Sequence, residues 1–292
     1  MAILKIENLK KTYKQGFIPR PHLVLKNVSF QLPSNSVTGF LGGNGAGKTT
    51  TIKCLLGLAN PDSGDVTFFN GQPLSEDVKR KIGFLPERPY FYEYLTGVEF
   101  LRFYGELTGN MKKSVLNDRI AALLKRVDLD HAKNKRLREY SKGMLQKIGV
   151  AQALIHDPEL VILDEPMSGL DPDGRFYLAE IIREAARDGR CVFFSSHLLP
   201  DAEALCERLV ILKGGEVTFE GQIEQFLQKM GEAAIINFIS NGHKNTMRVE
   251  SEVQLQAELM KLMKNGATIE MVKKDRNLEQ AFIKMGLRGD GT

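Results

Sequence analysis

The sequence predicts an α/β domain with a mainly parallel β-sheet, followed by a small α+β unit. Short apolar runs typical of strands buried on both faces alternate with helical segments between residues 37 and 208. After Gly221, a helix is followed by strand, strand, helix, strand and helix. A chain of 292 residues is long enough for one large domain and one smaller one.

The first predicted elements are strands. Residues 2–9 and 23–32 alternate apolar and polar side chains, and PSNS (33–36) turns the chain. The run VTGFL (37–41) predicts a buried strand, and a glycine loop with a helix over 48–58 follows it. The later elements are strands over 64–70 and 81–85, mainly helices over 96–155, a strand over 158–166, a helix over 172–189, a strand over 190–197, a helix over 201–208 and a hairpin over 209–221.

The change of pattern after Gly221 predicts the domain boundary. We expect a large domain over 1–222, with a helical subdomain over about 90–155, and a small α+β domain over 223–292. The small domain is expected to hold a helix over 223–233, strands over 234–240 and 246–250, a helix over 253–266, a strand over 267–274 and a helix over 277–286.

Composition excludes several classes of function. The net charge of +4 is too mild to predict nucleic-acid binding, which usually needs a basic patch. The three cysteines are far apart and form no CxxC pair, as expected for a reduced compartment. No apolar run is long enough to cross a bilayer, and the first residues lack a signal-peptide core. We therefore expect a soluble chain that reaches a membrane only through a partner.

The glycine-rich stretch after residue 41 fits the phosphate-loop pattern GxxxxGK[ST]. Its glycines let consecutive backbone N–H groups surround a phosphate, and the following helix directs its positive end at the same anion. Lys48 is expected to reach the β- and γ-phosphates, and the Thr49 hydroxyl to join a Mg²⁺ shell. The residues expected to bind the nucleotide here are Gly42, Asn44, Gly45, Ala46, Gly47, Lys48, Thr49 and Thr50.

Two acids end the apolar strand LVILDEP (160–166). Asp164 is expected beside the phosphate loop, where it can bind Mg²⁺ through water. Glu165 suits a general base that polarises the attacking water. The alternative is a strand end that carries two solvated acids.

Together with further motifs, these features resemble the ATP-binding subunits of ABC transporters over residues 1 to about 222. YSKGMLQK (140–147) is similar to the family signature, SGLD (168–171) matches the D-loop, and His197 matches the switch histidine. Tyr13 occupies the place where the family stacks an aromatic ring on adenine. The resemblance implies a P-loop NTPase of ABC type, with a RecA-like mainly parallel core sheet, an antiparallel β subdomain and a helical signature subdomain.

The resemblance also implies a mechanism that needs two subunits. Ser141, the expected N-cap of a helix, and Gly143 would contact the ATP that is held by a second copy of the chain or a related ATPase subunit, together with Asp171 of the D-loop. ATP would close this dimer, Glu165 would promote water attack, and His197 would stabilise the γ-phosphate. The dimer would open again after hydrolysis.

Cofactors and partners follow from the same resemblance. The cofactors are ATP and Mg²⁺, with Thr49, Glu87 and Asp164 at the metal. The partner is an integral-membrane permease of an exporter, which would hold the chain at the cytoplasmic face of the cell membrane, and no nucleic acid is expected.

Two positions depart from the usual family pattern. Glu87 stands where most members have glutamine, as it does in a branch of drug-export-type ATPases. Lys142 and Met144 replace glycine and glutamine of the signature. Lys142 either adds a cation near the γ-phosphate or lies in solvent.

The aromatic segment 89–107 has two expected parts. Tyr90, Phe91, Tyr92 and Tyr94 form an expected loop that contacts the permease. Phe100 and Phe103 are expected in the core of the helical subdomain, with Val98, Leu101 and Leu107 at helical spacing for a local core.

Two other functions are considered for the large domain. A soluble ABC-type mechanical ATPase usually carries two ATPase halves or a long coiled-coil insertion, and this sequence has neither. A non-catalytic nucleotide-binding regulator is disfavoured because Glu165 and His197 are both present. The small domain either buries an edge of the ATPase domain or has a regulatory or dimer-contact role.

Overall fold

The computed structural model describes residues 2–15, 20–108, 111–229, 233–240, 242–274 and 278–284. The chain divides into two compact units, 1–220 and 221–292. Within the described residues, no helix combines the length and the apolar character that a membrane crossing requires.

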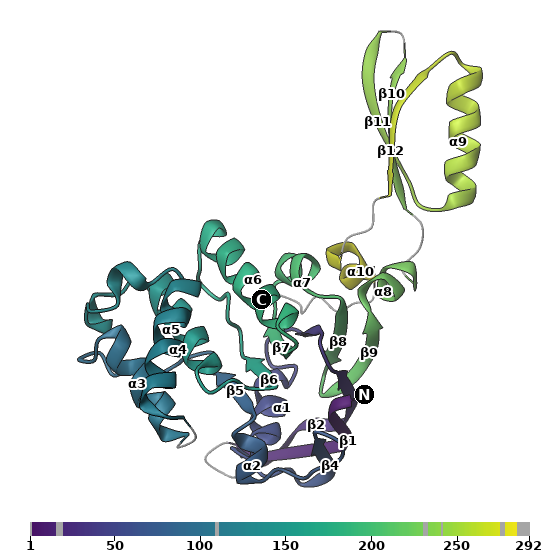
Figure 1. Ribbon diagram of the computed structural model, residues 1–292. Coiled ribbons are helices and arrows are strands. Elements are labelled where there is room, and N and C mark those ends of the chain that lie inside the picture. The colour runs from purple at the N-terminus through teal and green to yellow at the C-terminus, as the bar shows by residue number, and fades with distance from the viewer. Residues whose placement is uncertain are drawn as a thin grey trace. The chain divides into compact units, whose positions relative to one another are not determined.

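A nine-stranded sheet forms the centre of the first unit, in the order β4-β1-β2-β9-β8-β3-β7-β6-β5 (Figure 1). Strands β3, β5, β6, β7 and β8 pair in parallel, whereas β1 pairs antiparallel with β2 and β4. The strands are β1 (Ala2–Gln15), β2 (Arg20–Pro33), β3 (Val37–Leu41), β4 (Ser63–Phe68), β5 (Ile82–Leu85), β6 (Leu160–Leu163), β7 (Cys191–Ser196), β8 (Arg208–Lys213) and β9 (Glu216–Gln222).

Three of the parallel strands lie entirely in the interior. Every residue of β3, β6 and β7 is buried, as the continuous apolar runs predict for strands that are covered on both faces. β1 and β2 alternate exposed and buried residues instead, and both extend beyond the predicted ranges. The mainly parallel sheet and its antiparallel side are thereby confirmed.

Helices cover this sheet, and α3, α4 and α5 pack against one another as a separate group (Figure 1). A capping box between Thr96 and Glu99 begins α3, and the Ser141 hydroxyl accepts the Met144 N–H at the start of α5. The helices are α1 (Lys48–Leu55), α2 (Glu76–Lys79), α3 (Gly97–Leu107), α4 (Lys113–Arg126), α5 (Lys142–Leu154), α6 (Pro172–Arg187) and α7 (Leu199–Leu205), with 3-10 turns at Asp130–Ala132 and Leu137–Glu139.

The predicted core of the helical group is only partly right. Phe100 and Leu101 are buried, but Phe103 is 39% exposed and Leu107 is 66% exposed. The buried face of α3 is formed by Phe100 and Leu101 with two glycines. At 100° per residue Phe103 falls beside that face, whereas Leu107 is the last residue of the helix. The expectation that these two side chains belong to the core is therefore wrong.

The second unit contains a three-stranded antiparallel sheet with α9 along one face (Figure 1). Ile236 and Phe238 of the central strand pack against Leu262 of α9 in a small apolar core. Phe226 of α8 packs against Phe282 of α10, with ring centroids 5.9 Å apart. The elements are α8 (Ile223–Lys229), β10 (Ala234–Ser240), β11 (His243–Val249), α9 (Glu252–Lys264), β12 (Thr268–Lys274) and α10 (Leu278–Lys284), and the ends of the predicted helices at 230–233 and 285–286 fall largely outside the described residues.

Candidate functional site

The glycine loop joins the end of β3 to the start of α1. Gly45 and Gly47 have φ angles of 77° and 110°, in the left-handed region that favours glycine. A Cβ at position 47 would lie 2.6 Å from the Leu25 side chain, so only glycine fits there. Gly47 is the N-cap of α1 and provides no side-chain cap, which leaves the first N–H groups of the helix available to an anion.

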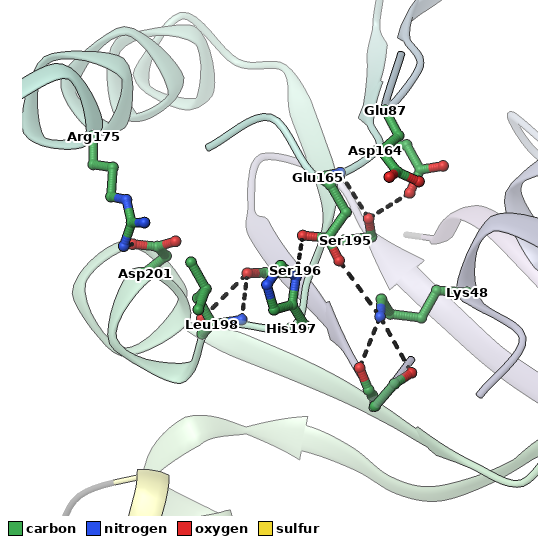
Figure 2. A network of polar contacts seen from close by, with 12 residues as sticks. Lys48, Glu87, Asp164, Glu165, Arg175, Ser195, Ser196, His197, Leu198 and Asp201 are labelled. Carbon is green, nitrogen blue, oxygen red and sulfur yellow. Dashed lines mark hydrogen bonds and ion pairs between the residues drawn. The ribbon is translucent and has the colours of Figure 1, made fainter. Parts of the chain in front are cut away.

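The Lys48 ammonium lies inside the loop and is almost fully buried. It donates to the Gly42 carbonyl at 2.7 Å and lies 3.4 Å from Glu165 Oε1 (Figure 2). A buried ammonium needs such acceptors because burial removes its hydration. The loop therefore holds a lysine charge where a phosphate would lie, paired with a carboxylate that follows β6.

Glu165 and His197 meet because β6 and β7 are neighbouring parallel strands. Each residue lies just beyond the carboxyl end of its strand, and His197 Nδ1 is 2.8 Å from Glu165 Oε2 (Figure 2). Parallel strands bring their carboxyl ends to one edge of the sheet, where ligands of this fold class bind. Glu165 has a φ of 51°, a left-handed conformation that costs a non-glycine residue about 1–3 kcal/mol.

Ser195 connects the two acids that follow β6. Its hydroxyl donates to Asp164 Oδ1 at 2.5 Å and accepts the Glu165 backbone N–H at 2.8 Å. Burial raises the pKa of the Asp164 carboxyl, while hydrogen bonds from Ser195 and Thr49 oppose that rise. The sequence reasoning did not select Ser195, although its position two residues before His197 places it at the end of a buried strand.

These residues border an open cavity of about 490 Å³. The predicted nucleotide-binding residues that lie outside its lining are Tyr13, Gly42, Ser141, Gly143 and Asp171. Asp164, a predicted metal ligand, also lies outside it. His22 and Val24, which the sequence reasoning missed, line it from β2. The residues lining the cavity are His22, Val24, Gly43, Asn44, Gly45, Ala46, Gly47, Lys48, Thr49, Thr50, Glu87, Glu165, Ser168 and His197.

Tyr13 lies next to His22 in the antiparallel ladder between β1 and β2. Its ring is half-buried, and the Lys11 ammonium lies 5.3 Å from the ring centroid. The pairing of Tyr13 with His22 depends on the register between β1 and β2, and the sequence of β1 alone does not specify that register. The stacking of Tyr13 on an adenine stays a prediction.

The signature and D-loop residues have structural partners in their own segments. Ser141 caps α5, as expected, and Asp171 Oδ1 accepts the Gly174 N–H at 2.9 Å to cap α6. Lys142 is exposed, and its ammonium lies directly over Gly169 of the D-loop. A role of Lys142 near the γ-phosphate of a partner's ATP stays a prediction.

Comparisons with known proteins identify the family of this chain. The ABC transporter family model matches residues 25–168, which include the phosphate loop, the signature and both acids. The ATP-binding protein YxlF of Bacillus subtilis, named as an uncharacterized ABC transporter ATP-binding protein, is 43% identical over 78% of this chain and 73% of its own length. MJ1023 of Methanocaldococcus jannaschii, also named as an uncharacterized ABC transporter ATP-binding protein, is 34% identical over 96% of this chain and 98% of its own length.

Solved structures show the same fold. The ATP-binding subunit of an ABC transporter is 32% identical to this chain, with a TM-score of 0.69 over 78% of this chain and 92% of that one. A dimeric bacterial ABC transporter cassette, MJ0796, is 27% identical, with a TM-score of 0.68 over 75% of this chain and 98% of that one. The chain therefore belongs to the family of ABC transporter ATP-binding proteins.

Proposed function

We propose that this chain is the ATP-hydrolysing subunit of an ABC exporter, in which ATP-driven closing and opening of a dimer is coupled to a separate membrane permease. The observation that carries the proposal is the placement of Glu165 between Lys48 and His197 at the mouth of the phosphate loop. Hydrolysis needs a group that binds the phosphates and a base for the attacking water. Lys48 would supply the first and Glu165 the second, and His197 would orient Glu165.

Each of these side chains has a role that its contacts support. Lys48 would leave the Gly42 carbonyl and Glu165 to bind the β- and γ-phosphates, since a phosphate is the stronger partner for an ammonium. Glu165, released from Lys48, would accept a proton from the attacking water. His197 would keep its Nδ1 contact with Glu165 and present Nε2 toward the γ-phosphate.

The side-chain oxygen atoms near Asp164 are suitable ligands for Mg²⁺. Thr49 lowers the pKa of the Asp164 carboxyl and the negative charge of Glu87 raises it, so both side chains act on this carboxyl. Mg²⁺ prefers oxygen ligands and is often held by one or two carboxylates together with substrate phosphates. Thr49, Glu87 and Asp164 would hold the ion, which when bound supplies charge neutralisation at the phosphates.

The second copy of the chain is proposed from the residues that lie outside the cavity. Ser141 and Gly143 are at the N-terminus of α5 and do not line the cavity of their own chain. A head-to-tail dimer would bring them to the partner's ATP, and the related cassette MJ0796 was solved as a dimer. Ser141→Arg should then abolish hydrolysis but leave nucleotide affinity of the monomer within about twofold of wild type.

The permease contact is proposed at the loop before α3. Tyr90 and Tyr94 are 81% and 67% exposed, whereas Tyr92 and Phe91 are half-buried, with Phe91 against Phe100. Exposed aromatic side chains mark interaction surfaces. This contact would hold the chain at the cytoplasmic face of the membrane.

The test separates transport from a mechanical role away from the membrane. The tagged chain is expressed with the membrane protein that its own genome encodes beside it, and co-purification and ATP hydrolysis are both measured. We expect the pair to co-purify, Tyr94→Glu to lose the permease, and the same variant to keep the hydrolysis rate of the isolated chain. Hydrolysis without any permease contact would favour the mechanical ATPase, and absence of hydrolysis would favour the regulator.

A further inference from the structure

Arg175 of α6 contacts two loops that lie on either side of the candidate catalytic residues. Its Nε donates to the carbonyl of Leu170, in the D-loop, at 3.1 Å. Its NH1 lies 3.9 Å from Oδ1 of Asp201, on α7, four residues after His197. Figure 2 shows Arg175 reaching toward Asp201 beside the segment that carries His197. One guanidinium thus spans from the loop after Glu165 to the segment after His197.

Asp201 is a buried acid that the proposed chemistry does not use. It is 8% exposed, and among the described residues its Oδ2 has no hydrogen-bond partner. A carboxylate in such a place is costly unless a cation lies beside it. Burial raises the pKa of Asp201, and the Arg175 charge opposes that rise. The ion pair with Arg175 therefore offsets part of the cost of burying the Asp201 carboxylate.

Apart from the contact between His197 and Glu165 and the Lys142 ammonium over Gly169, the hydrogen bonds within these loops are local. In the D-loop, the Ser168 and Leu170 N–H groups donate to carbonyls of residues 165 and 167, three residues earlier in each case. After β7, the Leu198 N–H donates to the Ser196 hydroxyl. Such short-range bonds shape each loop. Between the two segments, His197 contacts Glu165 directly, and Arg175 adds a second connection because it contacts Leu170 on one side and Asp201 on the other.

We propose that Arg175 and Asp201 are positioning residues for ATP hydrolysis. Together they fix the position of the D-loop relative to the segment that carries His197. The inference rests on the proposed function and deepens it. Neither side chain lines the nucleotide cavity, so both act through Leu170 and α7 rather than on ATP. Their loss should slow hydrolysis without weakening nucleotide binding, because the phosphate loop belongs to other elements.

The kinetic test uses Arg175→Ala, Asp201→Asn and the double variant, with Arg183→Ala as the matched control. Arg183 also joins α6 to α7, through the Ala204 carbonyl at 2.7 Å, but contacts neither loop. We expect kcat to fall about tenfold in each single variant, with KM for ATP within about twofold of wild type. The double variant should be no slower than the slower single variant, since the two residues act as one unit.

A second measurement does not depend on hydrolysis. Hydrogen–deuterium exchange of the amides at 168–171 should rise in Arg175→Ala and Asp201→Asn and stay unchanged in Arg183→Ala. The proposal is overturned if exchange is unchanged, if KM rises with kcat intact, or if Arg183→Ala slows hydrolysis equally. A wild-type chain without ATPase activity would contradict the proposed function instead, and the exchange experiment would still decide whether Arg175 holds the D-loop.

Discussion

The two units of the chain bury different kinds of side chain. In the first unit, Lys48, Asp164, Glu165 and Asp201 are all under 10% exposed. In the second unit, the buried side chains among the described residues are apolar and include Ile236, Phe238 and Leu262. Buried charges destabilise a fold unless they are paired, and they collect where chemistry needs them. The buried charged side chains therefore indicate that the candidate catalytic site lies in the first unit.

The largest expected effect is on the buried acid beside Lys48. Glu165→Gln keeps the shape of the side chain but removes the base, so ATP hydrolysis should fall by at least about 10²-fold while ATP binding persists. ATP-bound dimer should then accumulate and be visible by gel filtration. Wild-type turnover in this variant would show that the buried charge of Glu165 does not serve catalysis, and the contrast between the two units would then not indicate a catalytic site.

Truncating a core side chain in the second unit should lower stability and leave hydrolysis intact. Ile236 is fully buried, so Ile236→Ala should destabilise that unit by about 2–5 kcal/mol through the lost contacts and the cavity. Denaturant unfolding should show this loss, while hydrolysis by the first unit stays within about twofold. A large loss of hydrolysis would show that the second unit supports the nucleotide site.

A smaller effect is expected at Ser195, which has no charge but hydrogen-bonds to both acids after β6. Ser195→Ala removes one donor and one acceptor, and we expect about a tenfold loss of kcat with little change in nucleotide affinity. Ser36→Ala, in another buried serine whose hydroxyl donates to the Pro33 carbonyl, is the control. An equal loss in both variants would mean that general packing, and not the orientation of Asp164 and Glu165, is responsible.

The smallest expected effect is the pH dependence from His156, whose Nε2 lies 3.0 Å from the Ile82 carbonyl. Burial lowers its pKa below the ordinary value of 6.5, the Arg119 charge lowers it further, and the Ile82 contact and Asp157 oppose this. Well above pH 6.5 the ring is neutral in both folded and unfolded chains. As the pH falls below that value, the unfolded chain takes up the proton first, so stability falls until the folded pKa is reached.

This expectation is tested by unfolding at about pH 7.5 and about pH 5.5. The wild type should lose more unfolding free energy between these conditions than His156→Gln, which cannot titrate there. The exposed His131 provides the control variant, and His131→Gln should behave as the wild type. Equal losses in wild type and His156→Gln would show that the buried ring does not contribute.

His197 was predicted only through the resemblance to the ABC family, whereas the alternation of buried strands and helices, the phosphate loop and both acids after β6 could be predicted from the sequence pattern. These features depend on residues close together in the chain: glycines before Lys48, an apolar run before Asp164, and a helix N-cap at Ser141. Local backbone geometry and periodicity decide them, and the sequence displays both directly.

Only the tertiary structure decided which distant residues meet. Ser195 contacts Asp164 because β6 and β7 are neighbours, and Arg175 reaches Asp201 because α6 and α7 pack together. In the same way, the ladder between β1 and β2 placed His22 at the cavity. The orientation of α3 left Phe103 exposed, and Leu107 is exposed at the end of the same helix. These outcomes depend on strand order, register and helix rotation, which are set by the packing of the whole domain and not by any one segment.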